Sequence, residues 1–353
     1  MSTPYFSICI PQFNRTAHLL LALEALRAQS FQAFEICISD DASTDGREPE
    51  LCAWLETSGL SFRYVRQQES LRYDGNLRAS IALASGDYCV LMGNDDALAH
   101  SDTLAEIQEI LEHQRRPEVL VANYQQWQDG EVHRRILRSG PRGSGALLAA
   151  SSFRLFSFVS GLVIARKPLQ ALAHARWDGS EMYQTWSICR MLAQGARMYG
   201  DTRITVLKDI QIPGQSIDRY DRRPRERRWP IKPQKLPMGE LASLVTDAID
   251  VPGLGREQLT ALGYSVLRQL YAFTYPFWIF EYRRVQHFSY SLGVGLALAP
   301  SRISPRLPFS RVQRVRLWSR YVVRLSLALC LPTQLFERMR PLLHRLAKRQ
   351  FGG

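Results

Sequence analysis

The stretch YCVLMGNDDAL, Tyr88–Leu98, sets the frame for the N-terminal half of the sequence. Five mostly apolar residues run into Gly93, Asn94 and two adjacent aspartates, after which an apolar pattern resumes. Adjacent carboxylates repel one another, so Asp95 and Asp96 need solvent, cations or hydrogen-bond donors to stay ionised. A loop with helix-capping acids would account for the pair, and so would a functional site at the end of a buried strand.

Strand and helix patterns alternate on both sides of this stretch. The predicted strands are Phe6–Ile10, Glu35–Ser39, Phe62–Val65, Tyr88–Met92, Val119–Ala122, Phe158–Ala165 and Arg203–Leu207. The predicted helices are Ala17–Gln29, Asn76–Ala84, Leu104–Leu111 and Gln184–Gln194. The alternation favours an α/β fold with a mainly parallel sheet flanked by helices. The polar, glycine-containing segment 125–150 is expected to be a mobile loop region.

Polar clusters directly follow three of these strands. Pro11–Arg15 follows the first strand, Asp40 and Asp41 follow the second, and Asp95 and Asp96 follow the strand of the opening stretch. The carboxyl ends of parallel strands share one edge of a sheet, and ligands bind at that edge. We therefore expect the three clusters to gather at one site.

The composition is that of an ordinary globular protein, with 46% hydrophobic and 22% charged residues. Its six cysteines form no CxxC pair, which favours a reduced, cytosolic protein. The sequence begins without the basic and apolar regions of a signal peptide, and no window offers the roughly 18 uncharged apolar residues of a membrane-spanning helix. A cytoplasmic chain is expected.

The net charge of +12 is unevenly distributed. Residues 1–215 carry 21 basic and 24 acidic side chains, whereas residues 216–353 carry 24 basic and 9 acidic ones. We place a domain boundary near residue 215, inside a basic, proline-broken stretch. The basic C-terminal region favours a polyanionic partner, either nucleic acid or anionic lipid.

The segment Ser310–Leu331 predicts a basic amphipathic helix. Val315, Trp318 and Val322 share one face with two leucines, and arginines line the other face. Such a helix fits an anionic membrane surface. The alternative is an ordinary helix that packs its apolar face on the rest of the protein.

The motifs, taken in order, resemble a known family. SICIPQFNR (residues 7–15), ISDDASTDG (38–46) and NLRASIALASGDYCVLMGNDDAL (76–98) are similar to the nucleotide-sugar-dependent glycosyltransferases of family 2, which have the GT-A fold. The resemblance covers the first hundred residues well and continues more faintly to about residue 208. It implies a GT-A catalytic domain over residues 1–215, followed by a basic, mostly helical region over 216–353.

The resemblance also implies roles for single residues. Asp96 would bind a divalent metal, Mg²⁺ or Mn²⁺, and Asp95 would contact the donor's ribose or a metal-bound water. Carboxylate oxygens suit these metals, which commonly bridge substrate phosphates. Asn94 stands where the family usually has an acid. The remaining nucleotide-sugar-binding candidates are Pro11, Asn14, Arg15, Asp40, Asp41, Asn76 and Arg78.

Each of these further candidates has a plainer interpretation. Asp40 and Asp41 would contact the nucleotide base or cap a turn, and Pro11 would line the nucleotide pocket or merely end a strand. Asn76 and Arg78 would lie near the sugar nucleotide or be solvated residues on a helix's first turn.

The catalytic base is less well marked by the sequence. Members of the family that invert the anomeric centre commonly use an acid, often in a Glu-Asp pair, at the start of a later helix. Here Gln184 and Thr185 stand at that place. One general base near the acceptor hydroxyl would suffice, and Glu181 is the first candidate, ahead of Asp178. Both could equally be surface loop acids.

The resulting expectation is a glycosyltransferase that moves a sugar from a nucleotide-diphosphate donor to a saccharide or lipid-linked saccharide. It would work at the inner face of the cell membrane in the assembly of surface polysaccharide. Two alternatives remain open: an inactive glycosyltransferase-like scaffold, and a nucleic-acid-binding protein that uses its basic C-terminal region. The nucleic-acid alternative leaves the strand-end acids unexplained, so nucleic acid is not the expected partner.

Overall fold

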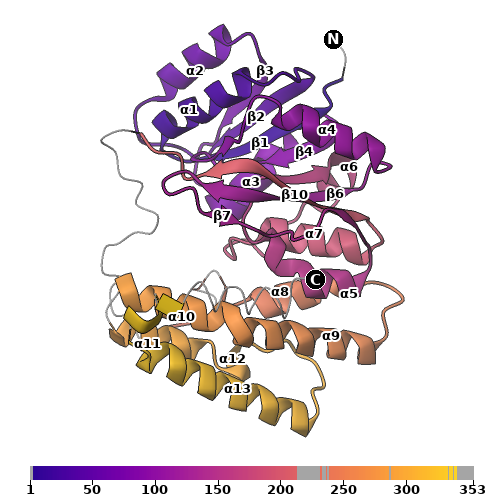
Figure 1. The fold of residues 1–353 in the computed structure, drawn as a ribbon, viewed down its shortest axis with the longest axis vertical. Coiled ribbons are helices and arrows are strands. Elements are labelled where there is room, and N and C mark those ends of the chain that lie inside the picture. The colour runs from indigo at the N-terminus through magenta and orange to yellow at the C-terminus, as the bar shows by residue number, and fades with distance from the viewer. Residues whose placement is uncertain are drawn as a thin grey trace. The chain divides into compact units, whose positions relative to one another are not determined.

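The computed structural model describes residues 3–212, 231–232, 236, 238–285, 288–332, 334–336 and 338–339. The chain divides into two compact units (Figure 1). The first comprises residues 1–145 and 154–217, and the second comprises residues 146–153 and 218–353. The boundary predicted near residue 215 lies outside the described residues.

A single mixed sheet forms the centre of the first unit, in the strand order β3-β2-β1-β4-β9-β6-β10-β5. Strands β3, β2, β1 and β4 are parallel, whereas β9 runs antiparallel to both β4 and β6. Sequence alternation therefore predicts one half of the sheet correctly and misses the antiparallel insertion. The strands are β1 (Phe6–Gln12), β2 (Phe34–Asp40), β3 (Ser61–Arg66), β4 (Tyr88–Leu91), β5 (Ala97–Leu98), β6 (Val119–Gln126), β7 (Val132–His133), β8 (Gly140–Gly143), β9 (Leu162–Ala165) and β10 (Met198–Lys208).

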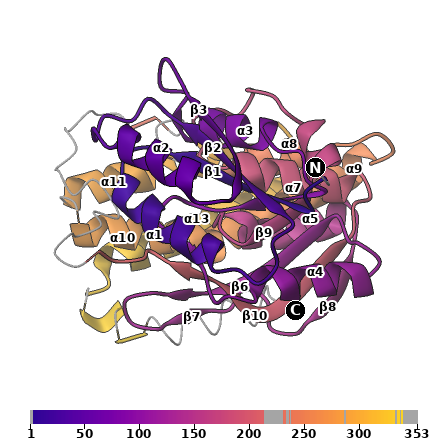
Figure 2. The same cartoon turned by 90° about the horizontal axis from the view of Figure 1, so that it is seen from above.

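Helices cover both faces of this sheet (Figures 1 and 2). Ile8, Ile36 and Val90 share one buried core with residues of α1, α2 and α4. Because side chains alternate along a strand, Cys9 and Cys37 lie on the opposite face, where α3 contacts β1 and β2. These cysteines are free and buried, as expected of small core residues. The helices of this unit are α1 (Thr16–Arg27), α2 (Glu48–Thr57), α3 (Arg72–Ala82), α4 (Thr103–His113), α6 (Arg166–Gln170) and α7 (Tyr183–Ala193), and the 3₁₀ turn η1 (Phe153–Phe156) begins on the last residue of the second unit's first segment.

Several predicted boundaries are wrong. Strand β10 begins at Met198 rather than Arg203, and helix α3 begins at Arg72 rather than Asn76. Strand β1 continues through Pro11, which lies in register with Ser39 of β2. Proline is tolerated there because the pairing with β4 on the other side already ends at Cys9. The strand predicted from Phe158 begins only at Leu162, after a turn at Gly161 with a φ of 78°.

The segment 125–150 is not a single loop region. Strand β6 extends to Gln126 and pairs with the short strand β7, and β8 pairs with β10 (Figure 2). Helix α5 (Ala146–Ser152) then begins. The sequence Gly140–Gly143 has no strand signal of its own, because its strand conformation depends on β10, a distant partner.

The second unit is helical. A π-helical turn, η3 (Leu270–Thr274), joins two helices without interruption, and α5 packs with α8 and α9. Gln269 Nε2 donates to the carbonyl of Ala150 of α5 over 2.8 Å. No helix within the described ranges is long and apolar enough to cross a membrane. The remaining helices are α8 (Leu241–Ile249), α9 (Arg256–Gln269), α10 (Tyr275–Val285), α11 (Phe288–Ala297), α12 (Pro300–Ile303) and α13 (Arg311–Cys330).

Candidate functional site

Three carboxylates meet beside the ends of β4 and β10. Asp95 and Asp96 come from the loop after β4, and Asp209 comes directly after β10. One oxygen from each lies within 4.8 Å of the others, close enough to share a metal ion. Asp96 and Asp209 are buried, and Asp95 is partly exposed. The acid pair of the opening stretch thus gains a third partner that the sequence interpretation did not include.

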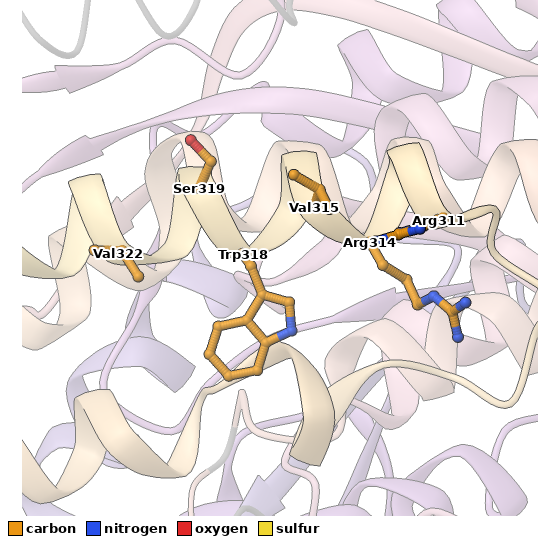
Figure 3. Close-up of a pocket in the computed structure, with 6 residues that line it drawn as sticks. All are labelled: Arg311, Arg314, Val315, Trp318, Ser319 and Val322. Carbon is orange, nitrogen blue, oxygen red and sulfur yellow. The ribbon is translucent and has the colours of Figure 1, made fainter.

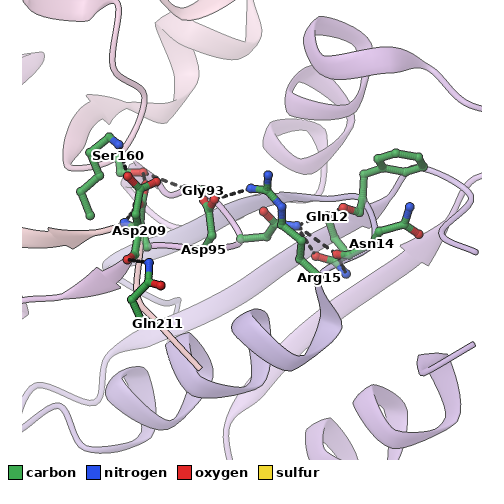
Figure 4. A network of polar contacts seen from close by, with 12 residues as sticks. Gln12, Asn14, Arg15, Gly93, Asp95, Ser160, Asp209 and Gln211 are labelled. Carbon is green, nitrogen blue, oxygen red and sulfur yellow. Dashed lines mark hydrogen bonds and ion pairs between the residues drawn. The ribbon is translucent and has the colours of Figure 1, made fainter. Parts of the chain in front are cut away.

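The backbone around these acids is held by short polar contacts (Figure 4). The Asp209 amide donates to Asp96 Oδ1 over 2.9 Å, and Ser160 donates its hydroxyl to the other oxygen of Asp96. Ser160 Oγ also accepts from the Gly93 amide over 2.8 Å. A Cβ at Gly93 would lie 3.0 Å from Asp96 Oδ2 and 3.3 Å from Asp95 Oδ1. A side chain at this position would crowd both carboxylates, which glycine does not.

The buried position of Asp96 affects its charge. Burial, followed by the repulsion of Asp95, raises the pKa of the Asp96 carboxyl to about 7. The hydrogen bonds from Ser160 and Asp209 and the charge of Lys208 act in the opposite direction. A carboxyl in this state gains strongly from a cation, which would favour its ionised form.

Two basic side chains already form ion pairs with the acid cluster. The Arg15 guanidinium forms an ion pair with Asp95, and the Lys208 ammonium forms one with Asp209. Arg15 ends the loop after β1 in a left-handed backbone conformation, with φ at 57°. Its side chain is 39% exposed and Asp95's only 16%, so the guanidinium stays accessible at the rim. Two predicted donor-binding residues, Arg15 and Asp95, therefore meet directly.

Asn94 faces the loop after β1. Its amide nitrogen donates to Gln12 Oε1 over 2.8 Å and to the carbonyls of Asn14 and Phe13 over 3.2 and 3.3 Å. An aspartate has no such donor. The residue that departs from the family's acid therefore joins two loops through contacts that only the amide can make.

Asn14 and Asn76 also hold the end of β1. Asn76 Nδ2 donates to the Gln12 carbonyl over 2.9 Å. Asn76 is buried and lies in the second turn of α3. It is therefore not a solvated residue of the helix's first turn. Asn14 Oδ1 accepts from the Thr44 amide over 2.7 Å, and Pro11 is partly buried in β1. Gln12, absent from the sequence-based candidates, is the hydrogen-bond partner that Asn76 and Asn94 share.

Asp40 and Asp41 are both engaged within the fold. Asp40 accepts from the Ser43 amide over 2.8 Å and from the Tyr64 hydroxyl over 3.2 Å. Asp41 accepts from the Ser70 hydroxyl over 2.7 Å and from the Leu71 amide. The capping interpretation thus describes contacts that exist, and contact with a nucleotide base stays a prediction.

The loop with the candidate bases is attached to α3 by two side chains. Buried Asp74 accepts from the backbone amides of Gly179, Glu181 and Tyr183 over 2.8, 2.9 and 3.0 Å. Burial raises the pKa of Asp74, although these amides act to lower it. Arg78 pairs with both oxygens of Asp178, over 2.5 and 2.7 Å.

Glu181 and Gln184 lie in the same neighbourhood. Glu181 is exposed, with φ at 59°. Burial and then the charges of Asp74, Glu181 and Asp96 raise the pKa of Tyr73, so those carboxylates all lie near its phenol. The phenol donates to Gln184 Oε1 over a long 3.5 Å. The loop and the acid cluster therefore border one region.

Sequence reasoning missed Asp209, Ser160, Lys208, Gln12 and Asp74. Asp209 had a usable signal, because it comes two residues after the predicted strand Arg203–Leu207, much as Asp95 comes shortly after the predicted strand Tyr88–Met92. Ser160 and Asp74 had none, since their partners lie 64 and more than 100 residues away in the sequence. Their roles depend on tertiary structure alone.

Known proteins match the first unit most clearly. Residues 7–162 match the sequence model of glycosyl transferase family 2. The abequosyltransferase RfbV of Salmonella typhimurium is 44% identical over 110 residues, which is 31% of this chain and 33% of that protein. The amylovoran biosynthesis glycosyltransferase AmsB of Erwinia amylovora is 27% identical over 190 residues, 52% of this chain and 62% of that protein. The chain thus covers a third to just under two thirds of these relatives.

Solved structures share the fold over more of the chain. The structure of S. aureus TarS 1-349 in complex with UDP covers 91% of this chain and 90% of its own, with a TM-score of 0.61 and 14% identity. The mannosyltransferase PcManGT of Pyrobaculum calidifontis, in complex with GDP-Man and Mn²⁺, covers 98% of this chain and 86% of its own, with a TM-score of 0.53 and 17% identity. Together with the family match, these likenesses establish the GT-A fold, and the chain carries a glycosyl transferase family 2 domain in residues 7–162.

Proposed function

We propose that this protein transfers a sugar from a nucleotide-diphosphate donor to a saccharide or lipid-linked saccharide acceptor, in the assembly of a surface polysaccharide. The observation that carries the proposal is the cluster of Asp95, Asp96 and Asp209 at the sheet edge of a family 2 domain. The relatives named for abequosyl transfer and amylovoran biosynthesis support the polysaccharide context. Residues 1–215 would be the catalytic domain and residues 216–353 a basic, mostly helical region.

The cluster suits Mg²⁺ or Mn²⁺, because both prefer carboxylate oxygens. Asp96 and Asp209 would hold the ion, with Asp95 contacting it directly or through water. When bound, the ion would neutralise the diphosphate leaving group. Ion binding would also weaken the hold of Asp95 on Arg15 and free a guanidinium that suits phosphate oxygens. The manganese named with the mannosyltransferase is consistent with this assignment.

The rest of the donor site would lie between β1 and β2. Arg15 would contact the diphosphate, and Asn14 and Pro11 would line the nucleotide pocket. Asp40 and Asp41 already accept hydrogen bonds at the end of β2, and their remaining lone pairs would face the base. Asn76 and Asn94 would act indirectly, since both hold the end of β1 through Gln12.

Glu181 would be the general base that removes the proton of the acceptor hydroxyl. Its exposed carboxyl lies near Tyr73, which also lies near Asp96. Asp178 is the weaker candidate because Arg78 occupies both of its oxygens. Direct attack by the acceptor oxygen would invert the anomeric centre. Gln184, where the family often has an acid, would not serve as the base, since an amide does not take up a proton at neutral pH; it is buried and donates to the Ser157 carbonyl over 3.3 Å.

The decisive experiment measures Mn²⁺ binding and sugar-nucleotide turnover in the same proteins. The intact protein is titrated with Mn²⁺ in the presence of UDP or GDP, and a panel of nucleotide sugars is tested for transfer or hydrolysis. We expect Asp96→Asn and Asp209→Asn to weaken Mn²⁺ binding roughly ten- to a hundredfold and to abolish turnover. Glu109→Gln, which removes an equal charge from an exposed position on α4, serves as the control.

The outcomes separate the alternatives. Unchanged Mn²⁺ affinity in Asp209→Asn would remove that residue from the metal site. Binding of a nucleotide sugar without turnover by any donor would favour an inactive scaffold. Failure to bind any nucleotide, combined with salt-sensitive binding of DNA or RNA, would favour the nucleic-acid function.

We also propose that the protein works at the cytoplasmic face of the cell membrane, held by its basic C-terminal region. This placement is supported by the excess of basic over acidic side chains in residues 216–353, because the inner leaflet presents anionic lipids. It fits a lipid-linked acceptor.

A further inference from the structure

Helix α13 buries a different face from the one that its sequence suggests. Leu317, Tyr321 and Ala328 are its buried residues. Val315, Trp318 and Val322 are 61%, 42% and 52% exposed. At about 100° per residue, these two sets lie roughly 110° apart around the helix axis. Three of the five residues on the predicted apolar face are therefore left in solvent, whereas Leu325 and Leu329 are partly buried.

The contacts of the buried face fix this orientation. The Tyr321 hydroxyl donates to the Gly295 carbonyl of α11 over 3.1 Å. At the other end, Arg283 of α10 donates to the carbonyls of Ala328 and Leu329 over 2.9 and 2.8 Å. Rotating α13 to bury Trp318 would break these bonds, so the exposed face belongs to the folded state of the helical unit.

The exposed face forms an open apolar groove with a basic edge. Trp318 and Arg314 project from the same side of the helix (Figure 3). Arg316, Arg320 and Arg324 are exposed on the other face of the helix, and α13 contains no acidic residue. The residues that line the groove are Arg311, Arg314, Val315, Trp318, Ser319 and Val322.

We propose that this face of α13 docks in the headgroup region of an anionic phospholipid bilayer. Tryptophan suits that region because its ring is apolar while its N–H stays near water. The arginine side chains can extend their guanidinium groups to lipid phosphates while the valines enter the acyl boundary. The charge of the face decides against other occupants. Binding a second copy would bring two arginine-rich helices together, and their charges would repel. Nucleic acid would bury little of the apolar surface of the valines.

The test uses the intact protein and vesicle flotation. One set of vesicles contains phosphatidylcholine alone, and the other contains an equimolar mixture with phosphatidylglycerol. We expect the parent protein to bind the anionic set. Binding should be roughly tenfold weaker in Trp318→Ala and in the double variant Arg311→Gln/Arg314→Gln. The matched controls are Trp127→Ala, which removes a tryptophan that is 49% exposed in the other unit, and Arg115→Gln/Arg134→Gln. Both controls should bind like the parent protein.

A spectroscopic measurement tests insertion separately from attraction. Brominated acyl chains should quench part of the parent protein's tryptophan fluorescence on anionic vesicles. Trp318→Phe should keep most of the binding and lose most of that quenching. Because no sugar nucleotide is involved, the result stands apart from the test of transfer.

Three results would overturn the proposal. The first is equal flotation of the parent protein and Trp318→Ala. The second is that RNA competes with the vesicles for the arginines and abolishes vesicle binding, while Trp318→Ala leaves that binding unchanged. The third is concentration-dependent self-association that Trp318→Ala abolishes, which would assign the face to a second copy.

Discussion

Asn94 is the residue at which this chain departs most clearly from the family's acidic motif. Its side-chain nitrogen lies opposite three oxygen atoms, one on Gln12 at the end of β1 and two in the loop that follows. An acid in its place would set a negative charge against those oxygens and remove the donor that they share, although the Asn14 carbonyl would still accept from Gln12 Nε2. The departure therefore has a structural reason, and Asp209 supplies a third carboxylate to the acid cluster.

Asn94→Asp restores the family's usual residue and should nevertheless harm this protein. We expect the free energy of unfolding to fall by about 1–3 kcal/mol, because a buried amide donor is lost from three acceptors. Mn²⁺ affinity should fall or stay level, since the loop that carries Arg15 loses its support. Urea unfolding and Mn²⁺ titration of the variant check both points. A tighter Mn²⁺ site at unchanged stability would contradict this account.

At this scale the sequence indicates which residue types can do the chemistry but not which ones meet. Asp95 and Asp96 could be predicted because two acids directly follow an apolar strand. Asp209 obeys the same rule at the end of β10, and applying the rule to every strand would have found it. Arg78 and Asp178 were separate candidates in the sequence, and only the fold shows that they pair with each other.

Among the elements, β2 is joined to its surroundings through one buried acid. Glu35 accepts from the Ser7 hydroxyl of β1 over 2.7 Å. It also accepts over 2.6 Å from the amide of Ser85, which lies just before β4 in the chain. Arg63 of β3 adds an ion pair over 3.2 Å. Burial acts to raise the pKa of Glu35, yet these partners outweigh it and hold the pKa below the usual 4.5.

Glu35→Gln should therefore destabilise the protein in a pH-dependent way. A carboxyl whose pKa is lowered by folding contributes stability above its unfolded pKa and loses it as the pH falls through the folded value. We expect a deficit of about 1–3 kcal/mol near neutral pH, which narrows as the pH falls below 4.5. Urea unfolding across this range tests it. A deficit that does not change with pH would point to packing rather than charge.

The elements themselves were largely predictable wherever the pattern is local. The apolar runs of β1, β2 and β4 and the helical spacing of α1 and α4 depend on nearby residues only. Strand β8 was missed because its conformation comes from pairing with β10. The buried face of α13 was missed because α10 and α11 select it, and no periodicity within one helix records which face its neighbours take.

For the whole molecule, the important fact is that the acid cluster and the helical unit belong to different compact parts of the chain. Asp95, Asp96 and Asp209 all lie in the unit formed by residues 1–145 and 154–217. Helix α5, although encoded between strands of that unit, packs with α8 and α9 in the other. A ligand stabilises the part of the protein to which it binds.

Calorimetry should therefore resolve two unfolding transitions with different responses to ligand. At about a hundredfold excess over Kd, Mn²⁺ with UDP or GDP should add about 2.7 kcal/mol to one unit, or roughly 5–10 °C in Tm. The second transition should stay in place, because the helical unit holds none of the three carboxylates. Asp209→Asn should abolish the first shift and leave the second transition unaltered. A single transition that moves as a whole would mean that the two units unfold as one cooperative body, and the division near residue 215 would then carry no energetic meaning.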